Sequence, residues 1–194
     1  MPCNGHFRCD AVVASFKHGA GTREVGQLAV WSVTSAKPGN GVDMLRDGRE
    51  DTYWQSDGMQ PHLVDISFQK KTRVSTLAVL LNYKLDESYT PRQLAVRGGT
   101  SYTDLKEIRT VEVNEPQGWV VIPLGGEEDP SLGVKLFLLQ LMIVSNHQNG
   151  KDTHVREVRV HGPQQATHAA LSDRKNDGEL ELSASLAAQF DTVR

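Results

Sequence analysis

Histidines, cysteines and carboxylates are the side chains of this sequence that could bind a metal ion or transfer a proton. The seven histidines are scattered. His147 and His154 flank a polar loop, but no cysteine or third histidine lies close to them, and a zinc site needs three or four ligands. Cys3 and Cys9 lie in the N-terminal segment, outside the apolar pattern. We interpret them as free thiols, with metal binding or oxidation as the alternative, and expect neither a metal nor another cofactor.

Acidic residues occur next to one another, at Asp86–Glu87 and Glu127–Asp129. Such groups are typical of solvated loops, and two adjacent carboxylates alone do not make an acid/base site. The sequence contains no HExxH, GxSxG, P-loop or paired CxxC motif. Because a hydrolase needs a nucleophile–base pair or a metal ion, we expect no enzymatic activity.

Composition and charge are those of an ordinary globular protein. The length of 194 residues allows one domain with tails. A net charge of -3 argues against a general nucleic-acid binder, which usually has a basic surface. The first residues lack the apolar core of a signal peptide, and the longest apolar run, 134–144, is shorter than the ~20 residues of a membrane helix. We therefore expect a soluble intracellular protein that binds neither nucleic acid nor membrane.

Short apolar segments with a two-residue period occupy most of the chain. Val64, Ile66 and Phe68 alternate with more polar neighbours, which predicts a strand with one buried face. Turn residues separate such segments, and no long amphipathic helices alternate with them, so a parallel α/β sheet is not expected. The pattern predicts an all-β sandwich. The expected strands are 27–32, 62–68, 74–81, 93–97, 107–113, 119–124, 134–144 and 154–160, and a helical turn is expected at 42–47. The expected inward side chains include Val64, Ile66, Phe68, Val96, Leu138 and Val158.

The two ends of the chain differ from this central part. Residues 1–18 have no sustained period, and we expect a flexible arm there. Residues 164–194 are rich in Ala, Ser and Asp and are expected to form a second tail. Leu182, Leu186 and Phe190 make an apolar stripe if that tail becomes helical, although so short a helix is marginal in water. The predicted domain is therefore 19–163.

Three polar loops, 47–59, 82–91 and 145–153, lie between the expected strands, and loops on a rigid sandwich are common binding sites. The third loop contains Asn146, Gln148 and Asn149, whose amides both donate and accept hydrogen bonds. Such a loop suits a peptide backbone or a sugar hydroxyl. The alternative is a tight turn at Asn149–Gly150 with the other polar groups solvated.

The sequence resembles the DOC-domain subunits of the anaphase-promoting complex in three ordered blocks, KPGNGVDMLRDGREDTYWQSDGMQPHLVDISF, DESYTP and NHQNGKDTHVREV. The resemblance covers about Gly19 to Pro163. The pattern D-x-x-x-x-T-x-W before an alternating strand also resembles galactose-binding, discoidin-type domains. Both resemblances imply a jelly-roll β-sandwich. We expect Trp54 to pack under its loop as a structural plug, and Tyr53 to shape the neighbouring surface.

The resemblance to DOC-domain subunits implies a non-catalytic function in the nucleus and cytoplasm. Such a subunit acts with a WD-repeat activator as co-receptor for the destruction-box degron of substrates, which promotes processive ubiquitination of cell-cycle proteins. Pairing of an aspartate with a histidine could instead hold the third loop in shape. Carried over by motif, with Asp152 the weaker candidate, the degron-binding residues would be Ser88, Asn146, His147, Gln148, Asn149 and Asp152.

The C-terminal dipeptide, Val193–Arg194, resembles the Ile-Arg end by which this family docks into a tetratricopeptide-repeat subunit of the complex. Replacing Ile by Val keeps a β-branched side chain and removes one methylene, worth about 0.8 kcal/mol if fully buried. We expect the dipeptide to dock, and the alternative is a disordered end. The arm and residues 164–189 match the family poorly, and we assign them no role beyond a tether.

A carbohydrate-binding module of the same fold is the competing hypothesis, and the fold alone cannot separate the two. Sugar-binding modules of this type are usually secreted and bind through aromatic platforms and arginine. The third loop is instead rich in amides and has no aromatic residue, which favours the ligase subunit.

Overall fold

The computed structural model describes residues 7–8, 12–13, 21–126 and 132–164. The chain divides into two compact units, Met1–Pro163 and Gln164–Arg194. The described residues of the first unit form the fold, and Gln164 is the one described residue of the second. The predictions for Cys3, Cys9, the stripe at Leu182 and the C-terminal dipeptide lie outside the described residues.

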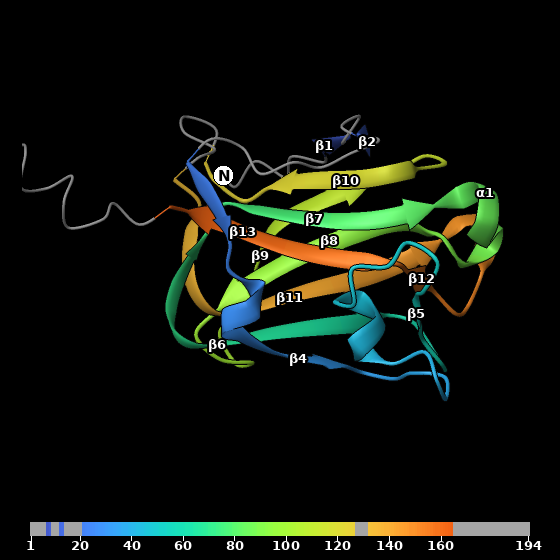
Figure 1. Cartoon of the computed structure of the whole chain (residues 1–194), viewed down its shortest axis with the longest axis horizontal. Coiled ribbons are helices and arrows are strands. Elements are labelled where there is room, and N and C mark those ends of the chain that lie inside the picture. The colour runs from blue at the N-terminus through green and yellow to red at the C-terminus, as the bar shows by residue number, and fades with distance from the viewer. Residues whose placement is uncertain (1–6, 9–11, 14–20, 127–131, 165–194) are drawn as a thin grey trace, which may run out of the picture. The chain divides into compact units, whose positions relative to one another are not determined.

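Two sheets form the body of the first unit (Figure 1). One contains, in spatial order, β1 (Phe7–Arg8), β9 (Lys106–Glu112), β8 (Pro91–Gly99), β11 (Val134–Asn146), β6 (His62–Val74) and β4 (Ala29–Val33). The other contains β2 (Val12–Val13), β10 (Gln117–Pro123), β7 (Thr76–Asn82), β13 (Glu157–Pro163) and β3 (Thr22–Glu24). A small ribbon pairs β12 (His154–Val155) with β5 (Trp54–Gln55).

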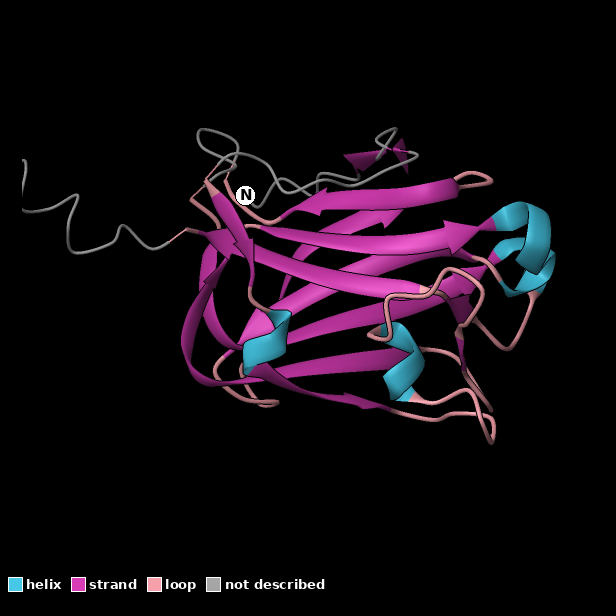
Figure 2. Ribbon diagram, viewed as in Figure 1, coloured by secondary structure: helices cyan, strands magenta, loops and turns pink. Residues whose placement is uncertain are grey.

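Helical structure in the described residues is limited to single turns between strands (Figure 2). They are η1 (Gly26–Leu28), η2 (Val42–Leu45), α1 (Tyr83–Asp86), η3 (Glu87–Tyr89) and η4 (His147–Asn149). The turn expected at 42–47 is η2. All described strand pairs are antiparallel except β1 with β9, so the predicted all-β sandwich is confirmed.

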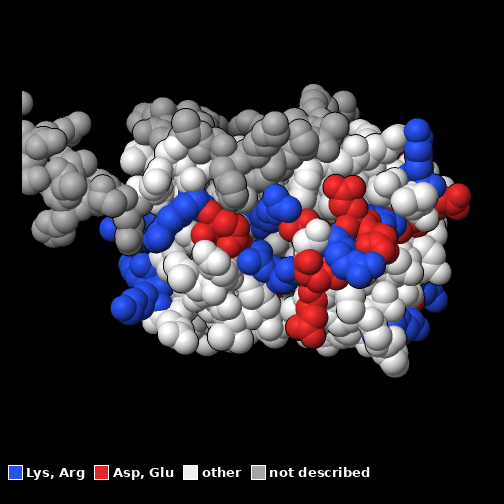
Figure 3. Space-filling model, in the orientation of Figure 1, with Lys and Arg blue, Asp and Glu red and all other residues white. Residues whose placement is uncertain are grey.

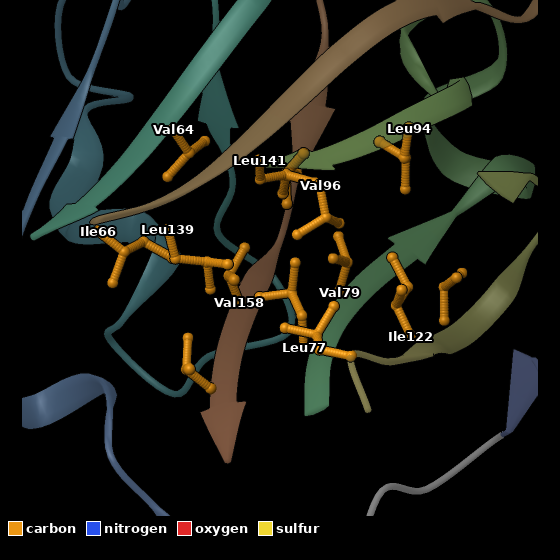
Figure 4. Close-up of a cluster of buried hydrophobic side chains, with 14 of the residues drawn as sticks. Val64, Ile66, Leu77, Val79, Leu94, Val96, Ile122, Leu139, Leu141 and Val158 are labelled. Atoms are coloured by element: carbon orange, nitrogen blue, oxygen red, sulfur yellow. The ribbon is translucent and has the colours of Figure 1, made fainter. Parts of the chain in front are cut away.

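The core lies between the two sheets, and Figure 4 shows its aliphatic side chains converging. Val64 and Ile66 of β6 are fully buried there, opposite Leu141 and Leu139 of β11. The two-residue period puts alternate side chains on this inner face. The other predicted inward residues Phe68, Val96 and Val158 also belong to this core.

Leu138 is buried, but it does not belong to the core between the sheets. It pairs with Ser67, whereas the next residue, Leu139, pairs with Ile66 and points inward. A register shift between Leu136 and Leu138 inverts the alternation along β11, as an inserted residue does in a β-bulge. The prediction that Leu138 points into the core was therefore wrong in its direction.

Each expected strand is present, with different bounds. β6 continues to Val74 through the polar residues 69–73, where no apolar alternation marks a strand. The strand expected at 154–160 is split at Arg156 into β12 and β13. β1 and β2 fall within the expected N-terminal arm and pair with β9 and β10.

Candidate functional site at the loop end of the sandwich

Two loops that the sequence singled out meet at one end of the sandwich, next to α1 (Figure 1). We call residues 83–90 the serine loop and residues 146–153 the amide loop. A Cβ atom on Gly150 would lie 1.8 Å from the carbonyl oxygen of Ser88, so only glycine allows the two backbones to approach this closely. The His147 backbone N–H also donates to the Thr90 carbonyl over 2.9 Å. Ser88 and the amide loop are therefore neighbours.

Gln148 and Asn149 form the exposed tip of the amide loop. Both have positive φ angles, 52° and 56°, which non-glycine residues rarely adopt and which are often found at functional sites. The Gln148 amide donates to the Tyr83 hydroxyl over 3.0 Å. Among the described residues, neither the Asn149 amide nor the hydroxyl of half-buried Ser88 has a hydrogen-bond partner. These polar groups are available to a ligand.

Asn146 is buried and closes the amide loop from inside. Its Nδ2 donates to the Asp152 carbonyl over 2.7 Å, and its Oδ1 lies 3.1 Å from the Thr153 hydroxyl, which donates to it. A buried amide that satisfies two groups of its own loop is occupied structurally. Asn146 therefore holds the start of the amide loop against its end.

His147 is also buried, and both its ring nitrogens are engaged. Nδ1 lies 3.0 Å from the Thr90 carbonyl, and Nε2 accepts from the Glu115 backbone N–H at 3.3 Å. Both ring nitrogens are therefore used within the protein and are not free to contact a ligand. The ring ties the amide loop to the start of β8 and to the turn before β10.

Asp152 is half-buried, and its carboxylate lies 3.8 Å from the Lys37 ammonium. Lys37 pairs more closely with Asp57, at 3.0 Å, and that hydrogen bond, helped by both carboxylate charges, raises the pKa of Lys37. The aspartate–histidine pair that the sequence left open exists elsewhere, between Asp86 and His154.

Asp86, the last residue of α1 within the serine loop, is the centre of a buried ionic cluster. Its carboxylate accepts from Arg156 at 2.8 and 3.0 Å and pairs with His154 at 3.1 Å. Burial favours a higher pKa for Asp86, but the hydrogen bonds from His154 and Arg156 outweigh it and lower the pKa. The prediction that Asp86 is a solvated loop charge was wrong. Arg156 and Arg159 interrupt the apolar pattern of 154–160, and Arg156 was the available signal for a buried acidic partner.

The His154 ring is stacked between two tyrosines of different loops, Tyr53 at 4.1 Å and Tyr89 at 4.3 Å between ring centroids. Tyr53 therefore joins the first polar loop to His154 at the start of β12, and through His154 to Tyr89 of the serine loop. Trp54 beside it is fully buried and donates from Nε1 to the Ser35 carbonyl over 2.9 Å. The prediction that Trp54 is a structural plug is confirmed.

Other kinds of site are not apparent in the described part of the chain. Its His, Cys, Asp and Glu residues include no group of three or more placed to hold a metal ion. Among the same residues, no helix has the length and apolarity to cross a membrane. Figure 3 shows acidic and basic side chains intermingled on the displayed face, without a field of one sign.

Solved structures with the same fold are carbohydrate-binding modules. The family 32 module of Clostridium perfringens NanJ in complex with galactose matches with a TM-score of 0.57 and 11% identity, over 70% of this chain and 95% of that one. A family 32 module from a Clostridium perfringens family 31 glycoside hydrolase matches with a TM-score of 0.57 and 17% identity, over 75% and 99%. At such low identity the likeness shows the fold alone, the jelly-roll β-sandwich.

Sequence comparison shows the family. The family model for "Anaphase-promoting complex, subunit 10 (APC10)" matches residues 7–186. Subunit 10 of Drosophila melanogaster is 50% identical over 172 residues, 89% of this chain and 85% of that protein. Subunit 10 of Homo sapiens is 50% identical over 73% of this chain and 75% of that protein, and subunit DOC1 of Saccharomyces cerevisiae is 40% identical over 74% and 58%. The chain belongs to the family of anaphase-promoting complex subunit 10.

Proposed function

We propose that this chain is a non-catalytic subunit of the anaphase-promoting complex that holds the destruction-box degron of a substrate together with a WD-repeat activator. Family membership supports the assembly. The observation that carries the degron role is the meeting of half-buried Ser88 with the loop that presents the exposed residues Gln148 and Asn149. Their hydroxyl and amides can pair with the backbone and polar side chains of a peptide.

Degron contact in this proposal comes from exposed groups, and buried groups position them. Asn146 and His147 act as positioning residues, because their polar atoms are engaged within the loops. A loop fixed before binding loses less conformational entropy when the peptide arrives. Asp152 contributes through its backbone carbonyl, which Asn146 binds, and through its charge near Lys37.

The energy required of this surface is small. One neutral hydrogen bond contributes about 0.5–1.5 kcal/mol net. The activator holds the rest of the degron, so a second weak contact on the same complex acts at high effective concentration. Slower release of the substrate then allows more ubiquitins to be added in one encounter.

Removing the three exposed polar groups tests the proposal. A variant combining Ser88→Ala, Gln148→Gly and Asn149→Gly keeps the positive φ angles accessible, because glycine adopts them without strain. We expect shorter ubiquitin chains in single-encounter reactions on a destruction-box substrate, and no change on a substrate without the box. Glu115→Gly is a matched control, since Glu115 is exposed and also has a positive φ of 43°.

Two results would overturn the degron role. Equal loss on both substrates would mean that the loop acts on the ligase in general. Unchanged chain lengths would mean that the amide loop is only a solvated turn.

A further inference from the structure

A groove of about 510 Å³ lies beside α1, and none of its lining residues belongs to the amide loop. It is bordered by Leu85 of α1, by the ends of β7 and β10, and by residues 50–51. Leu85 is 68% exposed and adds apolar surface to the rim of the groove. The groove therefore offers apolar surface that nothing in the described residues covers.

The unpaired polar side-chain groups at this groove include two hydrogen-bond acceptors. The Oδ1 atom of Asn82 is buried and has no hydrogen-bond partner. The carboxylate of exposed Glu50 has no partner among the described residues. Burying an acceptor without a donor costs free energy, and a rotation of the Asn82 side chain toward the groove would let a donor from a ligand recover that cost.

The charged groups around these acceptors are already engaged. The Arg156 guanidinium is bound to both oxygens of Asp86 and to the Glu50 carbonyl. Asp51 is paired with Arg49 at 2.7 Å. The carboxylate of Glu50 is thus available to pair with a ligand, and because it is negative the ligand should be a cation.

The apolar side chain of Leu85, the carboxylate of Glu50 and the amide oxygen of Asn82 together match one kind of ligand side chain. Arginine carries an apolar stem that can lie on Leu85 and a planar group of several donors that can reach Glu50 and Asn82. Lysine has the stem and the charge, but it offers a single point of donation to two separated acceptors.

We propose that this groove binds an arginine of the ligase substrate, a few residues beyond the polar stretch of its degron. The proposal rests on the degron role of the amide loop. The two surfaces share α1, because Tyr83 accepts the hydrogen bond from Gln148 and Leu85 borders the groove. An extended peptide advances about 3.3–3.6 Å per residue, so a few residues span this single helical turn.

Two matched substrates test the proposal on the assembled ligase with its activator. Both carry the same destruction box, and they differ only by arginine or glutamine at the position reaching the groove, found by scanning the arginine along the following residues. We expect the arginine substrate to bind several-fold more tightly at one narrow set of positions. Glu50→Gln and Leu85→Ser should each remove most of this advantage. Asp43→Asn, which removes an exposed carboxylate away from the groove, should leave it intact.

Three results would overturn the groove proposal. The arginine substrate could show no advantage at any position. Its advantage could persist in both Glu50→Gln and Leu85→Ser. Either variant could instead release the subunit from the ligase, which would make the groove a contact between subunits.

Failure of the degron role gives a different pattern. Gln148→Gly with Asn149→Gly should weaken binding of both boxed substrates while leaving the Glu50-dependent advantage measurable as a ratio of the two. If that loop variant changes nothing and the ratio still depends on Glu50, the degron role fails and the groove stands as an independent arginine site.

Discussion

Gln148 and Asn149 hold a backbone conformation that costs of order 1–3 kcal/mol per residue, and the residues around them maintain it. Asn146 ties the loop to the Asp152 carbonyl, and His147 ties it to Thr90. The result is a rigid tip whose amides face solvent. Strain at such a place is consistent with selection for presentation of polar groups rather than for stability.

The buried cluster around Asp86 makes a prediction at this same scale. Asp86→Asn leaves the Arg156 guanidinium buried without a counter-charge, which typically costs about 3–5 kcal/mol. Urea unfolding measures this loss. Glu87→Gln is the adjacent control, because Glu87 is exposed, and it should change the free energy of unfolding by less than about 0.5 kcal/mol. Equal effects of the two substitutions would contradict the ionic cluster.

The stability contributed by Asp86 should also depend on pH. Its pKa is lowered from its ordinary value of 3.8, because hydrogen bonds from His154 and Arg156 outweigh the effect of burial. The contribution is therefore complete above the unfolded pKa and is lost as the pH falls through the lower folded pKa. The difference in unfolding free energy between wild type and Asp86→Asn should be constant near neutral pH and shrink below pH 3.8. A difference that grows on acidification would show that the pKa is raised instead.

Residue types predicted that the amide loop is polar and exposed, but they did not predict which of its side chains point outward. Gln148 and Asn149 are exposed as an amide-rich loop suggests, but Asn146 in the same loop is buried. The amides of Asn146, Gln148 and Asn149 look equivalent in a sequence. They differ in backbone dihedral angles, and only Asn146 is bound by the Asp152 and Thr153 groups at the other end of the same loop, which residue types do not reveal.

The packing of the serine loop on the amide loop is a feature of the element scale. Gly150 has φ of -58°, which alanine adopts easily, so the need for glycine comes from the Ser88 carbonyl alone. Gly150→Ala should push the loops apart and shorten ubiquitin chains while the sandwich stays folded. Gly41→Ala is the control, since φ is -85° and nothing lies within 4 Å of the added atom. Thermal melts measure the stability of the sandwich, and chain-length analysis measures ubiquitination. Normal ubiquitin chain lengths with Gly150→Ala would contradict the need for the close approach of the two loops.

Strand positions were predictable because a buried face leaves a two-residue period, as in β6 between His62 and Phe68. Two features left no such trace. The bulge in β11 exchanges the faces of Leu138 and Leu139 within a continuous apolar run, and the polar half of β6 pairs through its backbone. Backbone pairing does not depend on side-chain polarity, so sequence period cannot reveal it.

Attachment to the ligase is a property of the whole molecule. We propose that Val193 and Arg194, outside the described residues, dock into a tetratricopeptide-repeat subunit. Deleting both should weaken incorporation into the complex without changing the thermal midpoint of the sandwich. Amidating the terminal carboxylate should weaken incorporation less, because the arginine remains. Unchanged binding of both altered chains to a recombinant repeat subunit would contradict the docking role.

The whole fold and its family were accessible from the sequence by different routes. Alternating segments predicted a sandwich, but the same sandwich also occurs in carbohydrate-binding modules at 11–17% identity. The blocks around Trp54, Ser88 and Asn149 distinguish the family, because they include loop residues that the sandwich itself does not require.

The dwell time of a destruction-box substrate on the activator-bound ligase tests the central claim most directly. Single-molecule measurement gives the dissociation rate without any ubiquitin transfer. For the ligase carrying Ser88→Ala, Gln148→Gly and Asn149→Gly, three lost hydrogen bonds of about 0.5–1.5 kcal/mol each predict release at least about ten-fold faster. The substrate without the box should leave wild-type and variant ligase at the same rate. Equal dwell times of the boxed substrate on wild-type and variant ligase would contradict the claim that this surface holds the degron.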